Sequence, residues 1–215
     1  MKLKAENISM EYKDGEKTKK IIDGVDLCFE KNGINVLVGP SGSGKSTLLY
    51  MLAALRRPTG GKLVFNGKNI ENDRLAERTR AEDFGFIFQR HFLIPYLTVM
   101  ENVRLGSENK ADDKEIMSLL ERLSIADLAN KKPYQMSGGQ CQRAAIARAL
   151  IKKPEVIFAD EPTAALDHEN AENIYSLLRE CSEESIVIIA THDTSLLSGD
   201  ENIYRIVDRK VVREA

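Results

Sequence analysis

The chain has 215 residues, 42% of them hydrophobic and 30% charged, which is enough for one large domain with its own core. Its 31 Lys and Arg residues against 33 Asp and Glu residues give a net charge of -2, which excludes the basic surface expected of a nucleic-acid-binding domain. No apolar run approaches the roughly 18–20 residues that span a bilayer, and residues 1–6 lack the apolar core of a signal peptide. Any membrane role must therefore come through a partner protein.

The hydrophobic pattern of the first 89 residues predicts five strands and two helices. Strands are predicted over residues 3–10, 25–30, 34–38, 62–65 and 84–88, and helices over 48–55 and 72–82. The polar segment 13–20 is typical of an exposed hairpin turn. Residues 25–30 alternate apolar and polar like an antiparallel strand, whereas 34–38 is continuously apolar like a buried parallel strand. Together these patterns predict a mixed sheet.

In residues 90–151 the spacing of apolar residues is typical of helices and no longer of strands. Helices are predicted over 98–105, 112–123 and 139–150. After Pro154, strands are predicted over 156–159, 185–190, 202–207 and 210–212, with a helix over 169–179. We therefore expect one α/β domain over residues 1–215, in which 1–89 and 152–215 form the core and 90–151 form an inserted helical subdomain.

Three cysteines are present, namely Cys28, Cys141 and Cys181. They are odd in number and have no metal-like spacing, which suits a reducing cytosolic compartment. We expect all three to be small packing residues.

A glycine-rich loop joins the predicted strand 34–38 to the predicted helix 48–55. It consists of Gly39, Pro40, Ser41, Gly42, Ser43, Gly44, Lys45, Ser46 and Thr47. Glycines let backbone N–H groups approach phosphate oxygens, and the helix N-terminus adds partial positive charge. Lys45 can then reach the β- and γ-phosphates, and the Ser46 hydroxyl can bind Mg²⁺. A glycine-rich turn that binds nothing is the alternative, but the flanking strand and helix favour a nucleotide site.

Two adjacent carboxylates, Asp160 and Glu161, follow the predicted strand 156–159. Ligand sites of α/β sheets lie at this end of the strands. Asp160 is suited to bind Mg²⁺ through water, and Glu161 is then free to act as a general base on an attacking water. The alternative, an acidic pair that caps a helix before Pro162, is less favoured once the phosphate-binding loop is present.

A further motif opens the predicted helix 139–150. Ser137 can cap this helix, and Gly138 and Gly139 leave its N–H groups open to an anion. The string Ser137-Gly138-Gly139-Gln140 is followed by Arg143 and by residues 161–167, Glu-Pro-Thr-Ala-Ala-Leu-Asp. Together these motifs closely resemble those of the ATP-binding cassette (ABC) ATPases, and the resemblance extends in family order from Tyr12 to His192. Met136 and Cys141 depart from the commonest residues, Leu and Gln, in tolerable ways.

The resemblance implies a phosphate-loop NTPase fold with a mixed-sheet core, an antiparallel β subdomain and an inserted α-helical subdomain. Tyr12 would stack on the adenine of ATP, although a lone tyrosine at a strand end is more often a packing residue. Gln89 would lie beside Mg²⁺ and the attacking water and sense the γ-phosphate. His192 would contact the γ-phosphate and orient the water.

In this family the serine-glycine signature contacts the ATP of the opposite subunit. Ser137, Gly138, Gly139 and Gln140 are therefore expected to complete the site of a second copy of the chain, arranged head to tail, with Asp167 at the dimer seam. All catalytic positions are filled, so a homodimer would have two competent sites. ATP would favour the closed dimer, and hydrolysis would open it.

The chain has one cassette, no fused membrane domain and no long coiled-coil insertion, which argues against the chromosome-maintenance, DNA-repair and translation-factor branches of the family. Residues 88–103 and 159–163 look like the bacterial lipoprotein-releasing, macrolide-exporting and antimicrobial-peptide-resistance group. The resemblance implies an ATPase on the cytoplasmic face of the membrane that powers a separate integral membrane permease. Because the chain ends soon after His192, we expect no C-terminal regulatory domain of the kind some importers carry.

The apolar segment 92–97 is where we expect a membrane subunit to dock, the alternative being ordinary packing of the helical part. Two other functions remain open at this point. One is an ABC ATPase that regulates cell-wall or division machinery through a membrane partner without transport. A soluble metabolic kinase is a weaker alternative, because it would explain only the phosphate-binding loop. The substrate is not encoded here, because the membrane subunit normally selects it.

Overall fold

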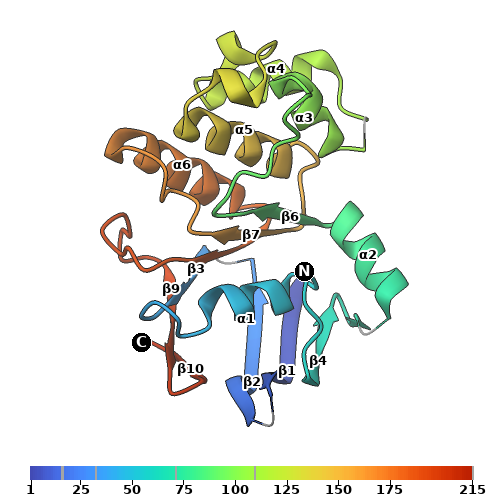
Figure 1. The fold of residues 1–215 in the computed structure, drawn as a ribbon, viewed down its shortest axis with the longest axis vertical. Coiled ribbons are helices and arrows are strands. Elements are labelled where there is room, and N and C mark those ends of the chain that lie inside the picture. Colours follow the sequence, from blue (N-terminus) through green and yellow to red (C-terminus); the bar gives the residue numbers. More distant parts are fainter. Residues whose placement is uncertain (16, 32, 71, 109, 215) are drawn as a thin grey trace.

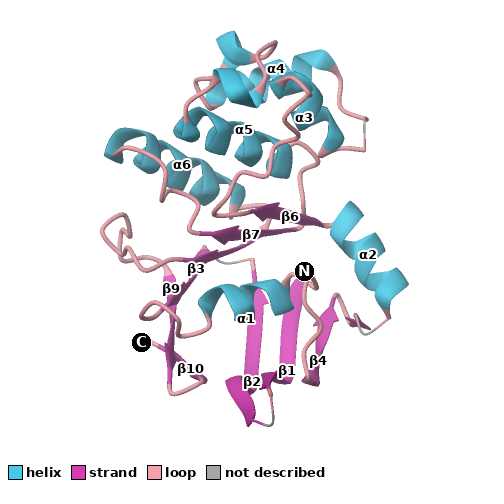
Figure 2. Ribbon diagram, viewed as in Figure 1, coloured by secondary structure: helices cyan, strands magenta, loops and turns pink. Residues whose placement is uncertain are grey.

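The strands form two sheets in the computed structural model of the chain, which describes residues 1–15, 17–31, 33–70, 72–108 and 110–214 (Figure 2). The first sheet has the order β2-β1-β4-β5 and is antiparallel. Its strands are β1 (Lys2–Asp14), β2 (Lys17–Glu30), β4 (Gly60–Phe65) and β5 (Lys68–Asn69). The second sheet has the order β10-β9-β3-β8-β7-β6. Its strands are β3 (Ile34–Val38), β6 (Phe84–Ile87), β7 (Val156–Asp160), β8 (Ile186–Ala190), β9 (Asn202–Val207) and β10 (Lys210–Arg213).

The second sheet is mixed, as predicted. Strands β9, β3, β8, β7 and β6 run parallel, and β10 pairs antiparallel with β9. The N-terminal strands do not contribute to this mixing, because β1 pairs with β2 on one edge and with β4 on the other. They form the separate antiparallel sheet that the family resemblance implied.

Strands β1 and β2 extend beyond their predicted ends. Their register continues through the pairs Tyr12 with Lys19 and Lys13 with Thr18. The prediction of a turn over 13–20 was therefore wrong for most of that segment, because the cross-strand backbone pairing overrides the low strand propensity of its polar residues. Glu16, within the same segment, lies outside the described residues.

The helices agree closely with the predicted ranges. They are α1 (Lys45–Leu52), α2 (Asp73–Glu82), α3 (Val99–Leu105), α4 (Asp113–Arg122), α5 (Gly138–Leu150) and α6 (His168–Cys181), with short 3₁₀ turns at Ala126–Leu128 and Pro133–Gln135. Reciprocal capping boxes explain where three of them begin. Thr98 caps α3, Asp112 caps α4 and Ser137 caps α5, each with a Glu or Gln three residues later.

Helices α3, α4 and α5 lie together beyond α6, on one side of the second sheet, while α1 and the first sheet lie on the other (Figure 1). Because side chains alternate along a strand, neighbouring residues of β3 contribute to different cores. Val36 packs in the cluster that contains α5 and α6, and Leu37 packs in the cluster that contains α1 and the first sheet. Burial on both faces explains the continuous apolar run of β3.

The packing role expected of the cysteines holds for two of the three. Cys141 is buried and Cys181 is partly buried against the core, but Cys28 is exposed on β2. The prediction for Cys28 was wrong because it occupies an outward position between the buried Leu27 and Phe29.

None of the helices in the described parts of the chain combines the length and apolar character needed to cross a bilayer.

Candidate functional site

The glycine-rich loop follows β3 and turns directly into α1. Gly42 and Gly44 have φ angles of 79° and 103°, in the left-handed region that favours glycine. At Gly44 a Cβ would also lie only 2.9 Å from Cγ2 of Ile21. Gly42, by contrast, has no heavy atom within 4 Å of its Cβ position. The loop thus combines a constrained backbone with an open side in front of the first turn of α1.

Lys45, the first residue of α1, is 8% exposed. Its Nζ donates to the carbonyl oxygens of Gly39 at 2.8 Å and Pro40 at 3.2 Å. The loop therefore wraps around its own lysine, and the ammonium group is held at the mouth of the loop without a carboxylate partner in the described residues. A cation in this position is suited to bind an anionic ligand.

A cavity of about 420 Å³ lies at this loop, within the size range of small-molecule sites. It is lined by Tyr12, Ile21, Ser41, Gly42, Gly44, Lys45, Ser46, Thr47, Gln89, Glu161 and His192. All of them except Ile21 are predicted site residues. Gln89, Glu161 and His192 follow the parallel strands β6, β7 and β8, whose carboxyl ends meet at one edge of the sheet.

Two residues of the loop face elsewhere. Pro40 and Ser43 line an adjoining hollow of about 980 Å³ between β2, the loop and the β9–β10 turn, which shares Ile21, Ser41 and Gly42 with the cavity. The hydroxyl of Ser43 is buried and has no hydrogen-bond partner in the part of the chain that the structure describes. An unpaired buried hydroxyl of this kind costs stability.

Asp160 lies behind the first turn of α1. It is 2% exposed, and its Oδ1 accepts a hydrogen bond of 2.9 Å from the hydroxyl of Ser46. Burial raises the pKa of Asp160, while its hydrogen bonds with Ser46 and Tyr50 lower it. Burial, with the nearby Asp160 carboxylate, also raises the pKa of Tyr50 to about 12. A desolvated carboxylate next to a serine hydroxyl is suited to a cation with oxygen ligands.

Glu161 is held in an unusual backbone conformation, with φ at 47°. Its Oε1 accepts the backbone N–H of His192 at 3.1 Å and lies 2.7 Å from Nδ1 of the same residue. Its Oε2 accepts the hydroxyl of Thr191 at 3.1 Å. A left-handed conformation at a residue other than glycine costs about 1–3 kcal/mol, so the surrounding contacts must hold it there. The segment after β8 therefore orients this carboxylate toward the cavity.

Thr191 is not among the predicted site residues. It is 2% exposed and directly follows β8, whose five residues are all buried and apolar. The only signal was a polar residue at the end of a buried strand, which is shared by many threonines without function. Its contact with Glu161 could be identified only from the packing of β7 beside β8.

The residues present suit a nucleotide with Mg²⁺. The open side of the loop, the Lys45 ammonium and the N-terminus of α1 offer a positive concave surface for phosphates. Ser46, Asp160 and Gln89 supply oxygen ligands of the kind that Mg²⁺ prefers. No cluster of three His, Cys, Asp or Glu side chains that could hold a metal ion by itself occurs among the described residues.

The serine-glycine signature does not line the 420 Å³ cavity. Ser137 caps α5, because its Oγ accepts the N–H of Gln140 at 3.2 Å while Gln140 Oε1 accepts the N–H of Ser137 at 2.9 Å. Beside Gly138 there is open space, with no heavy atom within 4 Å of a Cβ position. These residues thus form a second, outward surface at the start of α5.

Asp167 belongs to this second surface. It caps α6 by accepting the N–H of Asn170 at 2.9 Å, and Asn170 is also bonded by Arg143 of α5. The hydrogen bonds from Asn170 lower the pKa of Asp167. The signature helix and the turn at Asp167 are therefore joined side by side, while neither lines the cavity at the loop.

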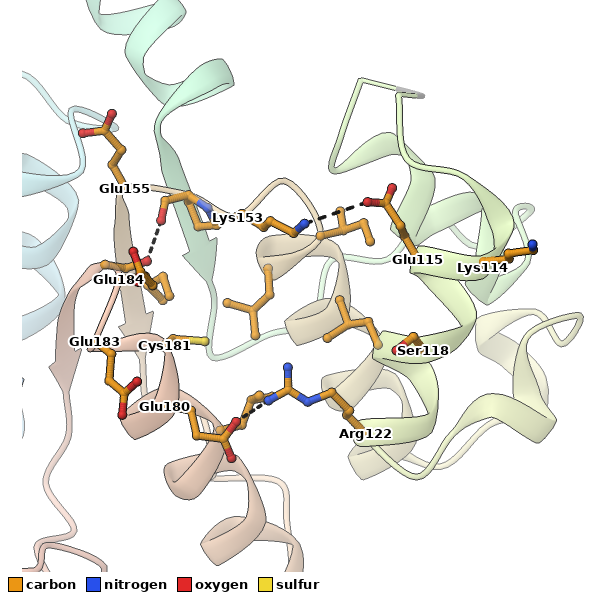
Figure 3. Close-up of a pocket in the computed structure, with 17 residues that line it drawn as sticks. Lys114, Glu115, Ser118, Arg122, Lys153, Glu155, Glu180, Cys181, Glu183 and Glu184 are labelled. Carbon is orange, nitrogen blue, oxygen red and sulfur yellow. Dashed lines mark hydrogen bonds and ion pairs between the residues drawn. The ribbon is translucent and has the colours of Figure 1, made fainter.

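The larger hollow of about 1020 Å³ lies elsewhere, between α4, the end of α5 and the end of α6 (Figure 3). Its lining includes the apolar residues Leu119, Leu150 and Ile157, and an ion pair between Arg122 of α4 and Glu180 of α6 crosses it. None of the predicted site residues lines it. Size alone therefore does not identify the chemical site of this molecule.

A family model described as "ABC transporter" matches residues 22–164. The chain belongs to this family. The ABC chain is 38% identical to the lipoprotein-releasing system ATP-binding protein LolD of Hydrogenovibrio crunogenus, over 96% of this chain and 94% of that protein. It is 40% identical to the macrolide export ATP-binding/permease protein MacB of Burkholderia pseudomallei, over 98% of this chain but only 33% of MacB.

Among solved structures, the ABC fold of the chain is similar to the dimeric cassette MJ0796 in a post-hydrolysis state with ADP and Pi. The TM-score is 0.91 at 35% identity, over 99% of this chain and 97% of that one. The predicted α/β phosphate-loop fold, ATP as ligand and ATP hydrolysis as activity are thereby confirmed. The chain is an ABC ATPase.

Proposed function

We propose that two copies of this ABC ATPase form a head-to-tail dimer that powers a separate integral membrane permease. The observation that carries the proposal is the division of the predicted residues between two surfaces. One surface is the cavity at Lys45, and the other is the start of α5 with Asp167. A two-fold axis would bring the second surface of each copy onto the cavity of the other.

Within each copy, the roles follow from the local geometry. The loop from Gly39 to Thr47, with Lys45, would bind the phosphates. Tyr12, which is 37% exposed and has the Arg56 guanidinium 5.4 Å from its ring centroid, would stack on the adenine. Ser46, Asp160 and Gln89 would hold Mg²⁺. When bound, this ion would neutralise phosphate charge.

The catalytic carboxylate would be Glu161. Its hydrogen bonds from Thr191 and His192 orient it before ATP arrives, so it can accept a proton from a water without reorganisation. If Nδ1 of the neutral His192 ring donates to Glu161, then Nε2 on the far side of the ring is an acceptor, free to accept a hydrogen bond from the water. The pair would thus position the water and remove its proton.

We further propose that residues 1–89 and 152–215 act as the nucleotide-binding core, and residues 90–151 as a helical subdomain that contacts the permease. Within the segment 92–97, Phe92 and Tyr96 are 57% and 71% exposed, whereas Leu93 is buried. Two exposed aromatic side chains near Gln89 support a docking surface. The packing alternative fits Leu93, and in part Ile94 and Leu97, which are half-buried.

The docking segment is tied to the signature helix. Nη1 of Arg148 donates to the carbonyl of Phe92 at 2.8 Å, and Nη2 donates to that of His91 at 2.9 Å. Movement of a docked permease would therefore displace α5 through Arg148, and would displace Gln89 through the backbone of residues 90–92. The relatives favour export or extraction of a lipoprotein, peptide or drug-like substrate, since their names combine ATP binding with lipoprotein release and macrolide export. Such an ATPase would act at the cytoplasmic face of the membrane.

Copurification tests this proposal. The tagged chain, carrying Glu161→Gln to preserve bound ATP, should be recovered from detergent-solubilised membranes of its own cell together with an integral membrane protein. Reconstitution of that complex in vesicles should then show ATP-dependent release or movement of a substrate. Recovery of a membrane partner with no substrate moved would favour the regulatory function instead, and recovery of no membrane protein would contradict both.

A further inference from the structure

Gln142 lies in the second turn of the signature helix α5 and is 2% exposed. Its side-chain Nε2 donates to two backbone carbonyls, that of Phe88 at 3.0 Å and that of Pro162 at 3.3 Å. Phe88 immediately precedes Gln89, and Pro162 immediately follows Glu161. One buried amide thus bridges the two segments that carry these site residues.

The place of this bridge in the sheet is specific. Strands β6 and β7 pair in parallel up to Ile87 with Ala159, and their backbone ladder ends there. Beyond that pair the two segments continue to Gln89 and Glu161. The Gln142 amide supplies the next connection between them, in place of a backbone hydrogen bond.

We propose that Gln142 is a positioning residue that sets the spacing between Gln89 and Glu161. Because Gln142 belongs to the signature helix α5, this spacing would depend on where that helix lies. The inference rests on the proposed function, in which these two residues act on one nucleotide and Ser137 on the nucleotide of the partner. Because Gln142 and Ser137 belong to the same end of α5, a shift of that helix on dimer closure moves both strand ends.

The chemistry of the side chain supports this role. A primary amide nitrogen carries two N–H donors, which match two carbonyl acceptors. Glutamate has the same shape but would place an acceptor, or a buried charge, against both carbonyls. Methionine fills a similar volume with no donor at all. Asparagine keeps both donors but is one methylene shorter.

The test is a kinetic series on the purified full-length chain with MgATP. Gln142→Met should lower kcat about 10- to 100-fold, because a displacement of about 1 Å in a catalytic group can cost that much. Its KM for ATP should stay within about twofold of wild type, since the phosphate-binding loop and Tyr12 are untouched. Gln142→Glu should be at least as impaired, and Gln142→Asn should recover part of kcat.

Asn35→Leu is the matched control. Asn35 is another buried amide, 3% exposed, and its Nδ2 donates to the carbonyl of Val187 at 3.1 Å within the sheet, away from both strand ends. It should lower the melting temperature at least as much as Gln142→Met while leaving kcat near wild type. Equal loss of kcat in this control, or unchanged kcat in Gln142→Met, would overturn the positioning role.

The two proposals fail in different ways. If the wild-type chain does not hydrolyse ATP, the proposed function falls and the positioning role falls with it. If the wild type hydrolyses ATP and only the Gln142 result is negative, the positioning role alone is overturned. Should Gln142→Met fail to fold, Gln142→Asn decides, because wild-type kcat in that variant would mean that the exact spacing does not matter.

Discussion

The carboxylate of Glu161 is bound twice by one residue, His192, through its backbone N–H at 3.1 Å and its ring Nδ1 at 2.7 Å. The two residues are 31 positions apart and meet because β7 and β8 are parallel neighbours. The arrangement keeps the carboxylate oriented in the absence of ATP, which is what a general base in a pre-formed site requires.

Glu161→Gln should therefore permit ATP binding and dimer formation while lowering steady-state phosphate release by about 10²- to 10⁴-fold. The amide keeps the shape of the side chain but cannot take a proton from water. Gel filtration with MgATP would measure the dimer. Glu77→Gln, at an exposed position of α2, is a matched control that should retain full turnover. Undiminished activity in Glu161→Gln would remove this residue from the base role.

Ser137→Arg should spoil the site of the partner while leaving the ATP affinity of the monomer unchanged, because Ser137 does not line the cavity of its own chain. A mixing experiment makes this sharper. Ser137→Arg and Lys45→Ala homodimers should each be inactive, but an equal mixture should regain activity, since half of its dimers combine one intact loop with one intact signature. No recovery on mixing would contradict the cross-subunit assignment.

Asp160→Asn should stabilise the ligand-free chain and abolish Mg²⁺-dependent ATP hydrolysis. Burial raises the pKa of Asp160 in the folded chain, so the folded state holds the proton more tightly than the unfolded state. The stability that protonated Asp160 gives the wild type is consequently lost as pH rises through this raised pKa. The asparagine amide of the variant does not titrate, and its oxygen can still accept the hydrogen bond from the Ser46 hydroxyl. The melting temperature of the variant should therefore exceed that of wild type at neutral pH, with each difference of about 1 kcal/mol appearing as roughly 2–4 °C in a chain of this size.

The measurement for Asp160→Asn is thermal unfolding without nucleotide between pH 4 and pH 8. The difference between variant and wild type should shrink as pH falls, because wild-type Asp160 then becomes neutral as well. A difference that stays constant across this range would show that titration of Asp160 is not its cause.

Tyr96→Ala should weaken binding of the membrane partner at least about tenfold, as loss of an exposed aromatic contact at an interface does, without changing the ATPase activity of the isolated chain. Val212→Ala, at a residue that is 56% exposed on β10, is the control for loss of an exposed apolar side chain. Equal recovery of the partner with Tyr96→Ala and with wild type would move the docking surface away from residues 92–97.

The local features of this chain could be predicted from its sequence. The glycine loop before Lys45 is a contiguous motif, and the buried strands are continuous apolar runs. Helices α3 and α4 each begin at a capping residue that is followed three positions later by a glutamate. Each of these signals acts within a few residues, where backbone geometry and side-chain periodicity determine structure directly.

Contacts between distant segments were decided only by the tertiary structure. The bridge from Thr191 to Glu161 and the bridge from Gln142 to the ends of β6 and β7 depend on which elements lie side by side. A threonine after a strand and a glutamine within a helix carry no local mark of such roles. Their function arises because parallel pairing of β6, β7 and β8 brings strand ends from distant parts of the chain to one edge, where single buried hydrogen bonds can connect them.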